Sequence, residues 1–442
     1  MIVFAIHTPN QHALLCVALS IAGAVLLAPA CGGRSDVFLQ AASAGGMTAE
    51  ANSTLVGGAS FTSTGGASFT STGGASFTST GGAPSGGTGA TSNLAHTVIA
   101  IAASVEFTCA LLSDGTVQCW GTNVRGGLGN GSTTSSTVPV RVLGITNAIA
   151  IAAGGLHACA LLADGMVQCW GENGEGQLGN VTQEPSSVPV TIVGVTGAVA
   201  LASGYFRSCV LLKDGTAQCW GQNGWADNFY AASVALRQVV LINGATAVTG
   251  NGCHNSVRNS DGTVQTWGVL GTCRVGQGTG SVASLPTTVS GITSATAVTD
   301  GLWHTCALLR DGTVRCWGGS YIGFLGDGTE SVSSVPVKVL GLTNATAISA
   351  GYDSTCAVIS DGTIRCWGSN SFGELGDGTE TNRLVPVKVL GITNAVAVSV
   401  GNFHACAILT GGVVQCWGYN SEGALGNGTT IESTTPVTVQ IL

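Results

Sequence analysis

The segment HACAILTGGVVQCWG, residues 404–418, decides the fold, because closely similar segments recur along the chain. The dipeptide Trp-Gly at its end serves as a ruler for the repeat. It occurs seven times, with successive spacings of 50, 50, 47, 50, 50 and 50 residues, at Trp120, Trp170, Trp220, Trp267, Trp317, Trp367 and Trp417. A fixed period of this length indicates an array of structural repeats.

The residues around this segment read as further short strands. AVAVSVG (395–401) precedes it, and a turn-rich GALGNGT (423–429) and then PVTV (436–439) follow it. Gly is abundant, with 68 copies, and only 8% of residues are charged, which favours strands and tight turns over helices. About four short strands per repeat is typical of a propeller blade or a related β-repeat.

The two ends of the array distinguish an open stack from a ring. HTVIAIAAS (96–104), at the start of the array, matches the small-residue segment that precedes each of the other six Trp units. The last copy stops at PVTVQIL (436–442), and no such segment follows it in the sequence. The sequence therefore predicts an all-β, seven-bladed β-propeller over residues 93–442, closed by pairing of the N-terminal strand with the C-terminal blade. Such closure would remove exposed sheet edges.

At this point the chain resembles a known family. GGLHACAL (154–161) and GNFHACAI (401–408), with the Asp-Gly-Thr-Val, Trp-Gly and Gly-x-Leu-Gly-(Asn/Asp)-Gly-Thr elements, are similar to the signature of the regulator of chromosome condensation repeats. The resemblance spans about 350 residues and implies a seven-bladed propeller. Members of the family bind many different partners, so the fold does not by itself assign a function.

Twelve of the sixteen cysteines form six pairs at a spacing of ten residues. In the hairpin from Cys109 to Cys119, a three-residue loop with Gly115 in the left-handed conformation would place the two cysteines directly opposite each other, within disulfide range. In the fourth copy, Ser256 and Thr266 replace both cysteines at once, as expected of partners. We therefore predict six disulfides, the alternative being buried free thiols: Cys109–Cys119, Cys159–Cys169, Cys209–Cys219, Cys306–Cys316, Cys356–Cys366 and Cys406–Cys416. Cys253 and Cys273 remain candidates for a seventh bridge.

The first 92 residues carry export and tether signals. Residues 1–30 contain an apolar run, ALLCVALSIAGAVLLAPA (13–30), which suits a signal peptide of the lipoprotein type with Cys31 as the lipidated residue. Plain secretion and an uncleaved anchor are the alternatives. Residues 31–92 form a low-complexity Gly/Ser/Thr tether in which GGASFTST occurs three times (57–80), and such a composition favours a flexible spacer. We expect an exported protein of the cell envelope, either an outer-membrane lipoprotein or a periplasmic or extracellular protein, that contacts the membrane through a lipid anchor only.

The ionisable residues give no catalytic or metal-binding constellation. His157, His304 and His404 share one repeat position that other copies fill with Phe, Arg or Ser, so we expect them to form hydrogen bonds within a blade. The Asp-Gly pairs are expected in hairpin turns, and the Trp-Gly tryptophans in the core between blades. The net charge of −8 without a basic cluster argues against nucleic-acid binding. We expect no catalytic residue, no metal and no cofactor.

The repeat is irregular in one place, and this irregularity gives the candidate binding residues. Between Trp220 and Trp267 the usual turn is replaced by GQNGWADNFYAASVALRQVV (221–240). This stretch concentrates residue types favoured at interfaces, which we take as candidates for binding, although a degenerate blade is an equal alternative: Trp225, Phe229, Tyr230 and Arg237.

Together these observations favour a non-catalytic, envelope-anchored binding scaffold that recognises a protein or a glycan through its propeller loops and acts as a monomer. The family resemblance implies one alternative, a guanine-nucleotide exchange factor-like regulator of a small GTPase. A propeller hydrolase or lyase is the other alternative, although no carboxylate cluster is visible at equivalent repeat positions.

Overall fold

The computed structural model describes residues 69–71, 74–76, 96–222, 232–239, 242, 244–251, 254–268, 276 and 283–441. Its elements are β-strands joined by turns and loops. None of the described residues forms an apolar helix of the length that a membrane crossing needs.

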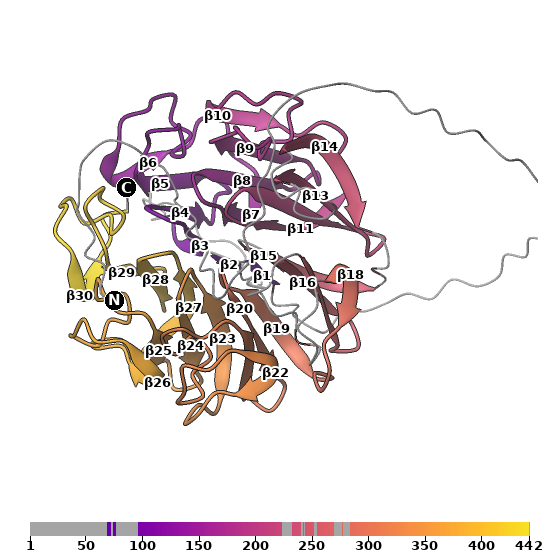
Figure 1. The fold of residues 1–442 in the computed structure, drawn as a ribbon. Helices are drawn as coiled ribbons and strands as arrows, with labels where there is room; N and C mark the ends of the chain where they lie inside the picture. Colours follow the sequence, from indigo (N-terminus) through magenta and orange to yellow (C-terminus); the bar gives the residue numbers. More distant parts are fainter. Residues whose placement is uncertain are drawn as a thin grey trace, which may run out of the picture. The chain divides into compact units, whose positions relative to one another are not determined.

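Strands β3 to β30 form seven antiparallel blades of four consecutive strands each, arranged around a central axis (Figure 1). Blades 1 to 3 comprise β3 (Val98–Ala103), β4 (Phe107–Leu112), β5 (Val117–Gly121) and β6 (Ser136–Arg141); β7 (Ala148–Ala153), β8 (His157–Leu162), β9 (Val167–Gly171) and β10 (Ser186–Thr191); and β11 (Ala198–Ser203), β12 (Arg207–Leu212), β13 (Ala217–Gln222) and β14 (Ala232–Val239). Blades 4 and 5 comprise β15 (Ala245–Gly250), β16 (His254–Asn259), β17 (Val264–Gly268) and β18 (Ala283–Thr288); and β19 (Ala295–Asp300), β20 (His304–Leu309), β21 (Val314–Gly318) and β22 (Ser333–Lys338). Blades 6 and 7 comprise β23 (Ala345–Ala350), β24 (Ser354–Ile359), β25 (Ile364–Gly368) and β26 (Arg383–Lys388); and β27 (Ala395–Val400), β28 (His404–Leu409), β29 (Val414–Gly418) and β30 (Ser433–Thr438).

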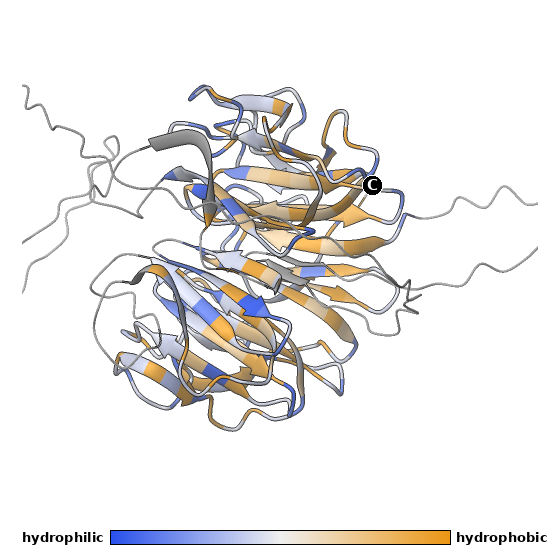
Figure 2. Ribbon diagram, turned by 90° about the vertical axis from the view of Figure 1, so that its right-hand side faces the viewer, coloured by the Kyte–Doolittle hydropathy of each residue, from blue (hydrophilic) through white to orange (hydrophobic). Residues whose placement is uncertain are grey.

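The four strands of a blade differ in composition according to their distance from the axis. The inner strand β3 is VIAIAA, and its small side chains fit because the inner strands of neighbouring blades contact one another around the axis. The second strand, β4, is buried along its whole length. The outer strand β6 is half-exposed and contains Pro139, which suits an edge because proline cannot donate a ladder hydrogen bond. Hydrophobic residues accordingly lie mainly along the strands (Figure 2).

The ring closes without a shared strand, so the prediction that the N-terminal strand pairs with the C-terminal blade is wrong. β3 pairs with β4 of its own blade, and the last sheet is made of β27 to β30. Blades 1 and 7 meet side by side, as other neighbouring blades do: β3 contacts β27 and β28, and Val98 and Ile101 share a core cluster with Ile408. A repeat that begins at its small-residue strand already contains the four strands of one blade. The last blade therefore does not need the N-terminal strand to complete its sheet.

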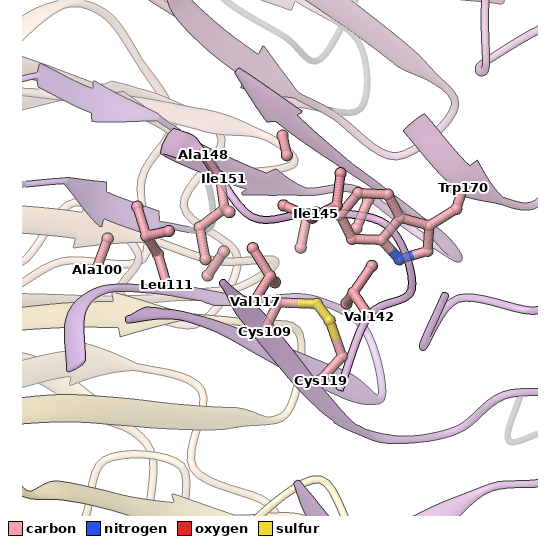
Figure 3. Packing of buried hydrophobic residues seen from close by; sticks show 14 of the residues in the cluster. Ala100, Cys109, Leu111, Val117, Cys119, Val142, Ile145, Ala148, Ile151 and Trp170 are labelled. Carbon is pink, nitrogen blue, oxygen red and sulfur yellow. A yellow bond between two sulfur atoms is a disulfide. The ribbon is translucent and has the colours of Figure 1, made fainter. Parts of the chain in front are cut away.

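Each Trp-Gly tryptophan packs into the core of the preceding blade, which confirms its predicted core role. Trp170 from blade 2 lies against Val142 and Ile145 of blade 1 (Figure 3). Its indole N–H donates to the carbonyl of Gly127 at 2.9 Å. The next glycine, Gly129, has φ +63, and a Cβ there would lie 2.9 Å from the Trp170 ring, which explains why the Gly-x-Leu-Gly turn ends in glycine. The same indole-to-carbonyl bond joins four other pairs of blades, through Trp120–Ala424, Trp220–Gln177, Trp367–Phe324 and Trp417–Glu374.

The six predicted disulfides are present, each between directly opposed residues of the second and third strands. They are Cys109–Cys119, Cys159–Cys169, Cys209–Cys219, Cys306–Cys316, Cys356–Cys366 and Cys406–Cys416. The connecting hairpin has the predicted form: Gly115 has φ +78, and its N–H donates to Leu112 O at 2.9 Å. Ser256 and Thr266 are paired in the same register in blade 4. Cys31, Cys253 and Cys273 lie outside the described residues.

Six residues of the low-complexity segment are β-strands. β1 (Phe69–Ser71) pairs with β2 (Gly74–Ser76), and β2 pairs with the inner strand β3, so the sheet of blade 1 has six strands. This differs from the prediction of a structureless tether at these positions. The inner edge of β3 offers unpaired backbone groups, and small residues can approach such an edge closely.

Candidate functional site

The propeller has two faces with different loops. On one face, which we call the loop face, lie the turns between first and second strands and the longer loops after third strands. Their proximity is shown in blade 1, where Thr122 N donates to Glu106 O at 2.9 Å. The opposite face, the turn face, carries the Asp-Gly hairpins. There Asp214 accepts hydrogen bonds from the amide (2.9 Å) and hydroxyl (2.7 Å) of Thr216, and these bonds lower its pKa, which confirms the expected turn role.

The mouth of the axis on the loop face is narrow. Backbone hydrogen bonds join the turns of different blades there, from Asn402 N to Ser104 O at 3.0 Å, and from Gly155 N to Tyr205 O at 3.1 Å. The remaining space is about 30 Å³ and is lined mainly by small residues and backbone groups. That volume holds one or two waters. A sugar ring or a long side chain therefore cannot enter at this point without movement of the turns.

Four buried histidines at one repeat position each contact a hydroxyl group of the next blade. His157 Nε2 lies 2.8 Å from Ser208 Oγ, and His404 Nε2 lies 2.7 Å from Thr108 Oγ1. His304 and His254 make the same contact with Thr355 and Thr305, at 2.7 and 2.6 Å. The expectation that these histidines bond within a blade is therefore wrong, because the repeat position faces the next blade. Burial lowers the pKa of His157 and His304 to about 3 and that of His404 to about 4, so all three are neutral at pH 7.

The irregular stretch named from the sequence is only partly described by the structure. Trp225, Phe229 and Tyr230 lie outside the described residues. Arg237 lies on β14, where its Cα is opposite Cys219. Their role in binding stays a prediction.

Blades 4 and 5 share a buried polar cluster around Asp300, which is fully buried. Its Oδ1 accepts hydrogen bonds from Ser256 Oγ at 2.7 Å and Thr305 Oγ1 at 2.9 Å, and lies 3.2 Å from His254 Nε2. Burial lowers the pKa of Arg207 to about 10, and the negative charge of Asp300 partly offsets this lowering. The cluster contains Ser, His and Asp, but the carboxylate contacts the serine directly and substrate has no access, so the arrangement is structural and not a nucleophilic triad.

A second feature, which the sequence reading missed, lies on the loop face between blades 6 and 7. Four half-buried aromatic side chains gather there, Tyr352 and Phe372 from blade 6, and Phe403 and Tyr419 from blade 7. Phe372 lies 5.2 Å from Phe403 and 5.1 Å from Tyr419 between ring centroids. Phe403 also lies 6.1 Å from Tyr419 and 6.3 Å from Tyr352. We call these four residues the junction patch.

Two carboxyl groups lie beside the junction patch. Glu374 is 1% exposed; its Oε1 accepts from Ser369 Oγ and its Oε2 from Phe372 N, both at 2.8 Å. Burial raises its pKa. Asp353 is half-buried, and burial together with the charge of Glu374 raises its pKa to about 7. Its Oδ1 is buried and accepts no hydrogen bond from the described residues.

A comparison of the repeats, position by position, would have pointed to Glu374. Glu374 is the variable residue of the Gly-x-Leu-Gly turn, where other copies have Gly127, Gln177, Phe324 and Ala424. An acid at a position that is otherwise small, neutral or apolar was the available signal. No cluster of three or more metal-ligating side chains occurs among the residues that the structure describes.

Comparisons with known proteins agree with the observed architecture. Models of the regulator of chromosome condensation (RCC1) repeat match residues 98–126, 148–177, 198–224, 296–321, 345–374 and 395–424, and a second RCC1 repeat model matches 114–161, 311–358 and 361–408. Together the matches span more than half of the chain, and they leave 225–295, which holds all four strands of blade 4, unmatched. Among curated proteins, none matches this sequence.

Solved structures with the same architecture include yeast RCC1 (Prp20) bound to Kap60, with a TM-score of 0.65, 19% identity, and coverage of 82% of this chain and 91% of that one. Prp20p from Saccharomyces cerevisiae, in a study of its binding to Gsp1p and histones, gives a TM-score of 0.66 and 20% identity over 78% and 88% of the chains. Human WBSCR16 gives 0.67 and 21% identity over 74% and 94%. At these identities the likeness concerns the fold.

Proposed function

Because the chain belongs to the regulator of chromosome condensation (RCC1) repeat family, a propeller fold that serves as a binding scaffold, we propose that it is a non-catalytic scaffold outside the cytosol that binds a partner with its loop face. The junction patch is the observation that carries this proposal. Half-exposed aromatic side chains gathered from two blades are typical of recognition surfaces. The turn face, in contrast, consists of repeated Asp-Gly hairpins whose polar groups bond locally.

The six disulfides indicate an oxidising, extracytoplasmic compartment. We extend this to anchoring: a lipid on Cys31 and the low-complexity residues between Cys31 and β1 would hold the propeller at the cell envelope and keep its loops away from the membrane. A Cys31→Ser variant should then leave the membrane fraction for the soluble one, while a Cys16→Ser variant should not. Unchanged fractionation of the Cys31→Ser protein would rule out the lipid anchor.

The two alternative functions receive less support. The Prp20p study concerns binding of that protein to Gsp1p and histones, and 20% identity carries only the fold to this chain. A small cytosolic GTPase would also be separated from a disulfide-rich exported domain. For an acid–base enzyme, Asp353 and Glu374 are the natural candidates, yet both Glu374 oxygens are hydrogen-bonded inside the protein and shielded from substrate.

Photo-crosslinking from defined positions tests the scaffold proposal. A photoreactive amino acid is placed at position 419 on the loop face or at position 213, an exposed turn-face residue, in the full-length chain made by its own cells. We expect a discrete crosslinked product from position 419 and none from position 213. Equal crosslinking from both positions, or none from either, would contradict recognition by the loop face.

A further inference from the structure

The carboxyl groups beside the junction patch have no cation of their own. Elsewhere on the loop face, two carboxylates are paired with arginine: Arg125 Nε lies 2.9 Å from Glu172, and Arg383 Nη2 lies 2.7 Å from Asp377. No ion pair among the described residues includes Asp353 or Glu374. The charges of Asp353 and Glu374 interact, and both carboxyl groups lie partly out of water, which raises the free energy of their charged forms.

The fold does not need these acids. The turn that holds Glu374 uses its backbone carbonyl, which accepts the Trp417 indole N–H at 2.9 Å. Gly127 and Ala424 perform the same task in other blades without a carboxyl group. At the position of Asp353, one other copy has an acid, Glu106, whereas others carry apolar residues such as Leu156 and Phe403. Two acids with raised pKa values, at positions where most repeats have no acid, are typical of a functional site.

The aromatic rings and the acids are physically linked. Phe372 donates its backbone N–H to Glu374 and contributes its ring to the patch. Burial raises the pKa of the Tyr352 phenol, and the charge of Asp353, its neighbour in the chain, raises it further. Ring faces carry negative electrostatic potential, so the patch and the carboxyl groups attract the same kind of ligand, a cation.

We infer, on the basis of the proposed binding function, that the junction patch with Asp353 is a subsite for the guanidinium group of an arginine on a protein partner. Glu374, whose oxygens are hydrogen-bonded inside the protein, adds negative charge to the site without contacting the ligand. A guanidinium is flat, stacks on aromatic faces and donates paired hydrogen bonds to a carboxylate. It is also more weakly hydrated than a lysine ammonium, which suits a partly desolvated site. Bound there, it would supply the positive charge that the acidic pair lacks.

Calorimetric titration with two blocked peptides tests this inference. The probes are acetyl-Gly-Gly-Arg-Gly-Gly-amide and the same peptide with citrulline in place of arginine, which keeps the shape and removes the charge. We expect the arginine peptide to bind about tenfold more tightly, the scale of a partly desolvated cation–π and ion-pair contact. Equal affinity of the two peptides would overturn the inference.

Matched variants locate the effect. Asp353→Asn combined with Glu374→Gln keeps the shape of both side chains and should lower affinity for the arginine peptide about tenfold. Asp327→Asn, on the same face of blade 5, should leave it unchanged. Near-ultraviolet circular dichroism verifies that each variant is folded. Unaltered binding by the double variant would also overturn the inference.

The same variants separate this inference from the proposed function. If the Asp353→Asn/Glu374→Gln protein still gives the crosslink from position 419, while Phe403→Leu loses it, the loop face binds but the arginine assignment is wrong. If wild type binds the arginine peptide yet no crosslink forms from position 419, the subsite stands and the cellular scaffold proposal fails.

Discussion

Blades 2 and 4 contain the same hairpin with different chemistry at its centre. In blade 2, Cys159 and Cys169 face each other and form a disulfide; in blade 4, Ser256 and Thr266 occupy the same register without one. Ser256 instead donates a 2.7 Å hydrogen bond to Asp300 of the next blade. The register is therefore set by the hairpin turn and the surrounding packing, and the disulfide is added to it.

The disulfide of blade 2 and the polar cluster of blades 4 and 5 should respond differently to substitution. A disulfide across ten residues contributes about 2–3 kcal/mol, chiefly by restricting the unfolded chain in the entropic model. A buried polar cluster contributes little net free energy when intact, but breaking it leaves charges and hydrogen-bonding groups buried without partners. We therefore expect the contact between blades 4 and 5 to be more sensitive to single substitutions than a disulfide-bonded hairpin.

Removal of Asp300 should have the largest effect. Asp300→Ala leaves Ser256 and Thr305 without their acceptor and removes the carboxylate that offsets the charge of buried Arg207. We expect a loss of about 3–5 kcal/mol in the free energy of unfolding. Urea unfolding measures it, with exposed Glu330→Ala as the control. A loss no greater than that of the control would show that the cluster is not a stabilising centre.

Removal of one disulfide from a regular blade should cost less. Cys159→Ala with Cys169→Ala should lower the free energy of unfolding by about 2–3 kcal/mol, with some further loss from the smaller buried side chains. The same urea experiment applies. Addition of a reductant should then destabilise the wild type more than the variant; an equal response would mean that this disulfide is not formed.

Acid should weaken the regular blades through their buried histidines. The pKa of His157 falls from 6.5 to about 3 on folding, so between these values the unfolded chain binds a proton that the folded chain excludes. The free energy of unfolding therefore decreases as pH falls through this window, by about 1.4 kcal/mol per pH unit for each such histidine. His157→Gln should reduce the slope by that amount in unfolding curves measured between pH 6 and 4, and an unchanged slope would contradict the prediction.

Asp353 provides a control of opposite sign. Its pKa rises from 3.8 to about 7 on folding, so its contribution to stability is present at low pH and lost as pH rises through this range. Asp353→Asn should therefore increase stability at pH 8 and steepen the loss of stability on acidification. A destabilised Asp353→Asn protein at pH 8 would show that the charged carboxylate has a stabilising partner.

The features that could be predicted from the sequence are those that depend on local spacing. The Trp-Gly period gave the number of blades, and the ten-residue cysteine spacing with Gly115 gave the hairpin and its bridge. Ring closure was predicted wrongly, because the same repeat can be divided into blades at more than one point, and only tertiary contacts reveal which. The His157–Ser208 bond and the junction patch depend on contacts between blades, which a period within the chain does not encode.

The smallest expected effect on the free energy of unfolding comes from introducing the Ser–Asp hydrogen bond of blades 4 and 5 between blades 2 and 3. Ser203 occupies in blade 3 the position that Asp300 has in blade 5, and His157 and Ser208 correspond to His254 and Thr305. Ser203→Asp should destabilise the disulfide-bonded protein, because the new carboxylate lacks a serine donor from the neighbouring blade. In a Cys159→Ser/Cys169→Thr background that donor is present, so the same change should be about 1 kcal/mol less damaging. A double-mutant cycle on urea unfolding measures this coupling; a value of zero would mean that the Ser256–Asp300 bond does not compensate for the missing disulfide.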